Sequence, residues 1–256
     1  MKPFRLNATH EAQLELNSDL QTAAADIVNL LGKRWKTLNP AHHLYIQLFN
    51  KAYRTFRSIH ILIREESIED GLCLLRVLAE TTINVAYAAK IGPAEAARSY
   101  WDWALLDAIR RRRDENRWKV GTVRTDEDVK RLLEKEQEIK TRRSPEEIEA
   151  FKRKGVFGVS LEERARVGSL ERIYRGSYRI TSRNTHAIDV IEMPAILDIL
   201  TEEDYQSFFD VRLDHLLSVS QVCLGMLAGT MNSSFKCGMD ARLALLKERD
   251  IFPVSF

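Results

Sequence analysis

Residues 72–89 read LCLLRVLAETTINVAYAA, and this nearly continuous apolar stretch decides the fold. On a helix its apolar side chains surround most of the axis, which predicts a helix in the interior of a bundle. Arg76 and Glu80 interrupt the stretch, so a buried helix explains it better than a membrane span. The sequence therefore predicts a helical core with charged side chains in or beside it.

The signals that begin and end helices recur along the chain. Asn39-Pro40 is a cap followed by a proline at the first helical position, Ser67 with Asp70 resembles a capping box, and Gly92-Pro93 ends one helix and opens the next. We expect helices over residues 9–35, 40–65, 67–92, from 93 past 109, from 170 into the cluster at 178–186, and over 201–231. Only 156–159 and 251–256 have an extended pattern. The prediction is an all-α, multi-helix bundle that forms a single domain over residues 1–256.

The segment 110–154 is a charged excursion from this bundle. It contains 16 Lys and Arg residues against 11 Asp and Glu residues, and Thr125 and Ser144-Pro145 each mark a helix start. Because charges of opposite sign on a helix mostly pair with each other, we favour a solvated helical hairpin. The four arginines Arg110–Arg113 leave a nucleic-acid surface open as the alternative.

The whole-chain composition points to few partners. A net charge of +2 creates no strong field toward nucleic acids or membranes. The three cysteines are scattered and lack the short paired spacing of zinc sites, so we expect reduced thiols, no metal and no cofactor. With no secretion signal at the start, the expected location is the cytoplasm, away from membranes.

Arg76, Glu80 and Asn84 recur every fourth residue and so share one face of the buried helix. One interpretation is a buried ion pair between Arg76 and Glu80 that sets the helix register. The other is that Glu80 orients a site residue on another helix, such as Arg183 or His186.

A second polar cluster reads YRITSRNTH over residues 178–186. On a helix, Tyr178, Ser182 and His186 form one row, and Arg179 and Arg183 lie on the next, with Asn184 beside them. This surface would offer an imidazole for proton transfer and guanidinium groups for an anion, which suits metal-independent cleavage of RNA. One histidine performs one proton transfer at a time, so a second copy in a dimer, or Tyr178, would supply the other. The alternative is a histidine that only stabilises a helix end.

The other histidines carry less weight. We expect His42 and His43 to be exposed, and His60 to belong either to the site or to a helix contact. His10 and His215 have no evident partners in the sequence.

Two family resemblances follow from these residues. The stretch Leu74–Glu80, together with the row at 178, 182 and 186, resembles the bacterial family known as domain of unknown function 5677 over about residues 44–228. That resemblance implies an all-helical cytoplasmic protein with matching positions Arg76, Glu80, Tyr178, Ser182 and His186, and no established activity.

Arg179 and His186, separated by six residues, are also similar to the motif of the HEPN ribonucleases, which are helical dimers of toxin and antiphage systems. Ile180 departs from that motif, which usually has a polar residue after the arginine. The leading hypothesis is a homodimeric, metal-independent endoribonuclease or toxin-like effector with RNA as substrate and a possible neutralising partner protein. The alternative is a non-catalytic helical binding or scaffold subunit of a larger complex.

Overall fold

The structure is a computed structural model that describes residues 6–118, 126–178, 181 and 201–249. Within these ranges every regular element is helical, which confirms the predicted all-α class. The longer helices are α1 (Ala8–Arg34), α2 (Pro40–Arg64), α3 (Ile68–Ile91), α4 (Pro93–Trp118), α5 (Asp126–Arg142), α6 (Pro145–Lys154), α11 (Glu202–Phe235) and α12 (Asp240–Glu248). The shorter ones are α7 (Leu161–Val167) and α8 (Glu171–Ile173).

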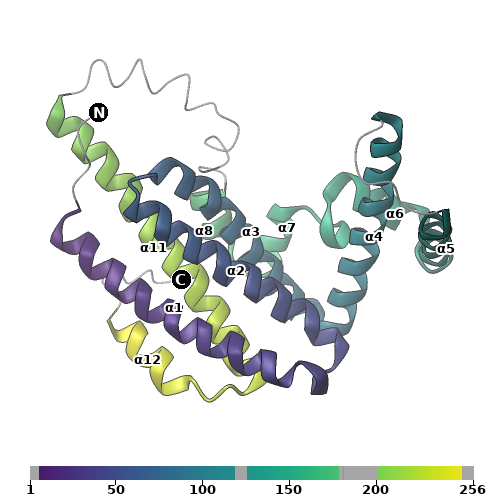
Figure 1. Ribbon diagram of the computed structural model, residues 1–256, viewed down its shortest axis with the longest axis horizontal. Coiled ribbons are helices and arrows are strands. Elements are labelled where there is room, and N and C mark those ends of the chain that lie inside the picture. Colours follow the sequence, from purple (N-terminus) through teal and green to yellow (C-terminus); the bar gives the residue numbers. More distant parts are fainter. Residues whose placement is uncertain (1–5, 119–125, 179–180, 182–200, 250–256) are drawn as a thin grey trace.

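The core lies where α1, α2, α3 and α11 pack side by side (Figure 1). As predicted, α3 is central: it contacts α2, α11 and α7, and Leu75, Leu78 and Ile83 are completely buried. Burial of each such side chain stabilises the fold by about 1.5–3 kcal/mol. Among the described helices only α3 is long and apolar enough to cross a membrane, but most of that stretch is buried against its neighbours. A core helix meets the same criteria of length and composition.

Most predicted helix ends are confirmed. The side chain of Asn39 accepts a hydrogen bond from the backbone of Ala41, and α2 begins with Pro40. Gly92 ends α3 with a φ of 91°, a conformation that favours glycine. The predicted capping box at Ser67 is wrong, because the Ser67 side chain makes no capping hydrogen bond although α3 does begin one residue later.

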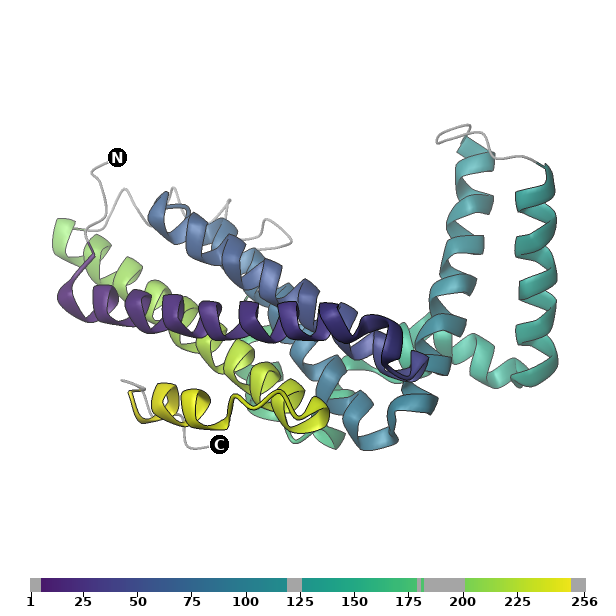
Figure 2. The ribbon, with the colours of Figure 1, turned by 60° about the horizontal axis from the view of Figure 1, so that its bottom comes forward.

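The charged excursion is a helical hairpin. Figure 2 shows α4 and α5 running side by side and standing away from the bundle. Several of its exposed cations pair with acids one turn away on the same helix, as in Arg131–Glu127 at 2.6 Å and Lys135–Glu138 at 2.8 Å. This pairing agrees with the solvated hairpin that the mixed charges predict.

A buried ion pair holds the base of the hairpin. Asp102 of α4 is 2% exposed and accepts hydrogen bonds from Arg142 and from Nε of Arg143, the latter at 2.9 Å. The Arg143 guanidinium also donates to Glu95 and Ser99. These contacts attach the carboxyl end of α5 to α4, so the hairpin has a stable base.

Two local predictions need correction. Residues 156–158 form a 3-10 turn rather than an extended segment. The other predicted extended segment, 251–256, lies outside the described residues and stays a prediction. The helix predicted from residue 170 into the cluster at 178–186 begins as α8 but widens into a π-helical turn at Tyr174–Tyr178. The helix α12 was not predicted.

Candidate functional site

Arg76, Glu80 and Asn84 form a polar row on one face of α3. This polar row contacts two other elements, and its members do not pair with one another. Arg76 forms no ion pair with Glu80 within the described residues, so the predicted ion pair is wrong. Nη2 of Arg76 instead donates a hydrogen bond to the phenol oxygen of Tyr178 at 3.1 Å, and its guanidinium carbon lies 4.9 Å from the centre of the Tyr178 ring. This contact joins the two polar clusters that the sequence singles out, through residues that are 102 positions apart.

Arg164 of α7 is a member of the cluster that the sequence reasoning missed. It is only 4% exposed, and its Nη1 donates to Oδ1 of Asn84 on α3. Its Nε is buried and has no hydrogen-bond partner among the described residues. The available signal was its position: Arg164 shares one face of α7 with Leu161, Ala165 and Gly168, which predicts that it points to the interior rather than to solvent.

The tight approach of α7 to α3 explains why Arg164 reaches the site. Gly168 ends α7 directly against α3, and a Cβ at this position would lie 3.1 Å from the Cβ of Ala86 and 3.2 Å from the carbonyl oxygen of Arg164. A larger residue would therefore push α7 away from α3. The glycine brings the guanidinium of Arg164 to the polar row.

Glu80 is half-buried at the centre of this group. Burial lowers the pKa of Arg164, while the charge of Glu80 opposes that shift. Burial raises the pKa of Tyr100 on α4, and the charge of Glu80 raises it further. Within the described residues the Glu80 carboxylate accepts no hydrogen bond, so its oxygens can still bind a proton, a ligand or another side chain.

Aromatic rings form the walls around these polar groups. Phe157 lies 5.2 Å from Tyr87 and 6.2 Å from Tyr100 between ring centres, and the Arg164 guanidinium is 5.9 Å from the Phe157 ring. Phe157 has a φ of 68°, which costs a non-glycine residue of the order of 1 kcal/mol or more. The packing of its ring holds it in this conformation. On the other side Tyr174 stacks on Tyr178 at 5.5 Å.

The arrangement combines a cation, a phenol and a carboxylate in a partly buried setting. Arg76 donates its hydrogen bond to the phenol oxygen of Tyr178. The phenol proton itself therefore remains free to be donated. Two guanidinium groups, those of Arg76 and Arg164, lie near the Glu80 carboxylate, which accepts no hydrogen bond from the described residues. These are the groups that acid–base chemistry on an anionic substrate requires.

Five predicted site residues, Arg179, Ser182, Arg183, Asn184 and His186, lie outside the described residues. The structure brings together Arg76, Glu80, Asn84 and Tyr178. It also places Thr181, which is buried and donates from its hydroxyl to the Ser177 carbonyl oxygen at 2.6 Å.

Several histidine predictions are corrected. His42 and His43 are half-buried: His42 meets the edge of Phe235, and His43 stacks on Trp35 at 3.9 Å between ring centres. His10 does have partners, because it completes the amino-terminal capping box of α1 and its Nε2 lies 3.2 Å from Asp214.

His60 is a buried helix contact. Burial lowers its pKa to about 4, and the nearby charge of Arg64 adds to that shift. The His60 side chain is 6% exposed and stacks on the ring of Phe56, so it cannot reach a substrate. His60 is therefore excluded from the site.

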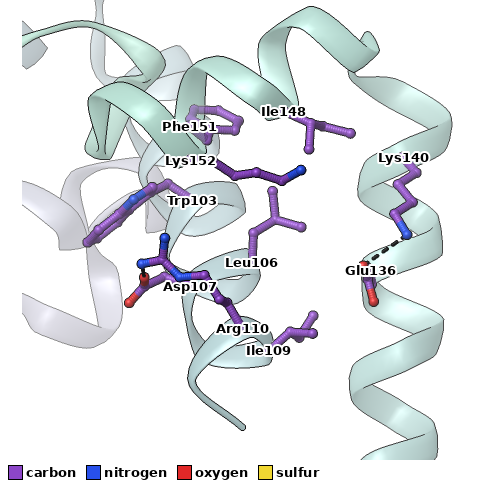
Figure 3. A pocket seen from close by; sticks show the side chains of 10 residues that line it. All are labelled: Trp103, Leu106, Asp107, Ile109, Arg110, Glu136, Lys140, Ile148, Phe151 and Lys152. Carbon is purple, nitrogen blue, oxygen red and sulfur yellow. Dashed lines mark hydrogen bonds and ion pairs between the residues drawn. The ribbon is translucent and has the colours of Figure 1, made fainter. Parts of the chain in front are cut away.

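A separate cavity lies at the base of the hairpin, between α4, α5 and α6 (Figure 3). It has a volume of about 220 Å³ and an apolar floor that includes Trp103 and Leu106. The charged side chains at its rim form ion pairs with nearby acidic residues, as in Lys140–Glu136 at 2.9 Å. Because these cations are already neutralised, the cavity is a weaker anion site than the cluster around Arg76.

The chain belongs to a family of unknown function, DUF5677, whose model matches residues 42–193. The match runs from α2 through the second polar cluster, so it includes all the predicted site residues, but it ends before α11, earlier than the expected boundary near residue 228. No curated protein and no solved structure matches the chain.

Proposed function

We propose that this protein is a metal-independent endoribonuclease or toxin-like effector that acts in the cytoplasm. The observation that carries the proposal is the Arg76–Tyr178 hydrogen bond of 3.1 Å. It brings the polar row of α3 to the residue from which the arginine and histidine cluster at 179–186 continues. We infer from this contact that the two polar motifs, distant in the sequence, form one site.

In the proposed reaction His186 takes the 2′-hydroxyl proton of RNA, and the freed oxygen attacks the adjacent phosphorus. Tyr178 donates its phenol proton to the leaving 5′-oxygen. Arg179 and Arg183 bind the phosphate and stabilise the charge of the phosphorane. Glu80 orients His186, and Arg76 holds the phenol of Tyr178 in position.

Because Tyr178 can donate its phenol proton, one copy of the chain would supply both the acid and the base. The proposed site is therefore complete without a second copy. A homodimer, which the HEPN resemblance implies, would then serve to bind RNA or to regulate the protein rather than to supply a second acid. A neutralising protein partner would act by covering this site.

The test is cleavage of total cellular RNA in the presence of a chelator by the wild-type protein, His186→Ala and Tyr178→Phe. Loss of a proton-transfer group should lower the rate by about 10²–10⁴-fold. Tyr53→Phe is the matched control, since it removes a half-buried phenol hydroxyl that makes no hydrogen bond among the described residues. Circular dichroism of every variant establishes that it is folded.

The alternative function, a non-catalytic binding or scaffold subunit, is favoured by one observation. The Arg164–Asn84 contact is buried and attaches α7 to α3, as a purely structural bond would. If no folded variant and no wild-type sample cleaves RNA, and Tyr178→Phe instead lowers stability, this alternative replaces the nuclease.

A further inference from the structure

The outer face of α2 has an unusual charge. The helix spans 25 residues and contains no aspartate or glutamate. Its apolar face is buried in the core, while Lys51, Arg54, Arg57 and Arg64 are all exposed. Their positions place them on one side of the helix, with Arg54 near the middle. From Lys51 to Arg64 this side extends for about 20 Å at the helical rise per residue.

None of these four cations forms an ion pair with any residue that the structure describes. The contrast with the hairpin and α6 is direct, because Arg131, Lys135 and Lys152 are also exposed but each lies within 3.2 Å of a glutamate oxygen. An exposed cation that is already paired gains little from a bound anion. The positive charge of α2 is therefore available to a ligand.

Neutral hydrogen-bonding side chains surround two of the cations. Lys51 and Arg54 line a shallow groove of about 390 Å³. The groove also contains four amide or hydroxyl side chains and one leucine from α3: Gln47, Asn50, Thr55, Ser58 and Leu74. Cations accompanied by amide and hydroxyl groups are the residue types that contact the phosphates and sugars of nucleic acids.

A membrane surface fits this face less well. Helices that lie on membranes insert an exposed apolar face into the bilayer. On α2 the exposed large apolar side chain is Ile61, at 51%, and it stands among polar neighbours. The face offers charge and hydrogen bonds but little apolar area.

We propose that the outer face of α2 binds the phosphodiester backbone of single-stranded RNA, with Lys51, Arg54 and Arg57 as the main contacts. This deepens the proposed function, since it identifies the surface along which the substrate lies. The groove residue Leu74 and the site residue Arg76 are two positions apart on α3 and so point to nearly opposite sides of that helix. Binding and cleavage are therefore measured separately.

The experiment measures fluorescence anisotropy of a labelled 20-nucleotide RNA whose 2′-hydroxyls are methylated, which prevents the proposed cleavage. The triple variant Lys51→Gln, Arg54→Gln, Arg57→Gln is compared with a matched control, Arg131→Gln, Lys135→Gln, Lys152→Gln. Both triples lower the formal net charge of +2 by three. The α2 triple removes cations that have no ion pair among the described residues, whereas the control triple removes cations that are already paired with glutamates.

The α2 triple should weaken binding by about tenfold or more at 0.1 M salt, and the slope of log K against log salt should fall by about 2. The control triple should stay within about threefold of wild type. Equal losses in both triples, or no binding by the wild type, would overturn the proposal. If the wild type binds phosphatidylserine vesicles but not RNA, and the α2 triple loses that binding, the face is assigned to a membrane instead.

The two proposals fail in different ways. If RNA binds through α2 but wild-type protein never cleaves the unmodified strand, the nuclease proposal fails and the binding face stands. If the α2 triple binds and cleaves RNA like the wild type, the binding face fails and the nuclease stands.

Discussion

Replacing His60 by leucine should remove a specific acid sensitivity from this protein. His60 is 6% exposed, stacks on Phe56 at 5.7 Å between ring centres, and has a buried Nε2 with no hydrogen-bond partner among the described residues. Burial, together with the charge of Arg64, lowers its pKa from 6.5 to about 4. The native state therefore resists a proton that the unfolded chain binds readily.

The sign and size of the effect follow from this difference. The unfolded chain takes up the proton as the pH falls through 6.5, whereas the native state does so only near pH 4, so stability falls on acidification. The loss reaches about 2 kcal/mol at pH 5 and approaches about 3 kcal/mol below pH 4. Above pH 7.5 His60 contributes no pH dependence.

The assay is urea unfolding of wild type and His60→Leu at pH 7.5 and pH 5.0, followed by circular dichroism. Other groups that titrate, including His215, are present in both proteins, so their effects cancel in the comparison. The wild type should lose about 2 kcal/mol more than His60→Leu between the two pH values. Parallel losses within about 0.5 kcal/mol would refute the reasoning and return His60 to the list of groups that can exchange protons near neutral pH.

Two further predictions concern the framework around the site, and both are measured by urea unfolding. Asp102→Asn should destabilise the protein by about 3 kcal/mol because it removes the charge of the buried carboxylate that both Arg142 and Arg143 bind, whereas Arg131→Ala should cost about 0.5 kcal/mol or less; equal costs would show that the buried pair does not hold the hairpin. Gly71→Ala should destabilise by about 1 kcal/mol or more, because the new Cβ would lie 2.7 Å from the methyl of a buried leucine. Gly32→Ala, with open space around it, should instead stabilise α1 by up to about 1 kcal/mol, and a gain at both glycines would contradict the packing of α3 against α11.

The fold was largely predictable because its determinants are local. The buried character of residues 72–89, the cap at Asn39 and the stop at Gly92 each depend on side chains a few positions apart, and the structure confirms the helices that they predict. The π-helical turn at Tyr174–Tyr178 was not predictable in this way, because a local change of helical pitch has no simple residue pattern.

The candidate site was predictable only in its parts. The spacing of four shows that Arg76, Glu80 and Asn84 share one face of a helix, and the structure places them so. Helical periodicity does not say which element covers that face. The partner of Asn84 is Arg164, eighty positions along the chain, and that pairing depends on the close approach of α7 at its glycine end.

The sequence by itself thus determined the helical class of this protein, the central place of α3 and the shared face of its polar row, since all three follow from short-range periodicity and capping. The tertiary structure alone decided that Arg76 binds Tyr178 rather than Glu80, that Arg164 enters the site, and that Glu80 accepts no hydrogen bond from the described residues. These outcomes depend on which helices pack together. The free energy of that packing comes from apolar faces throughout the chain and not from the polar residues that it brings into contact.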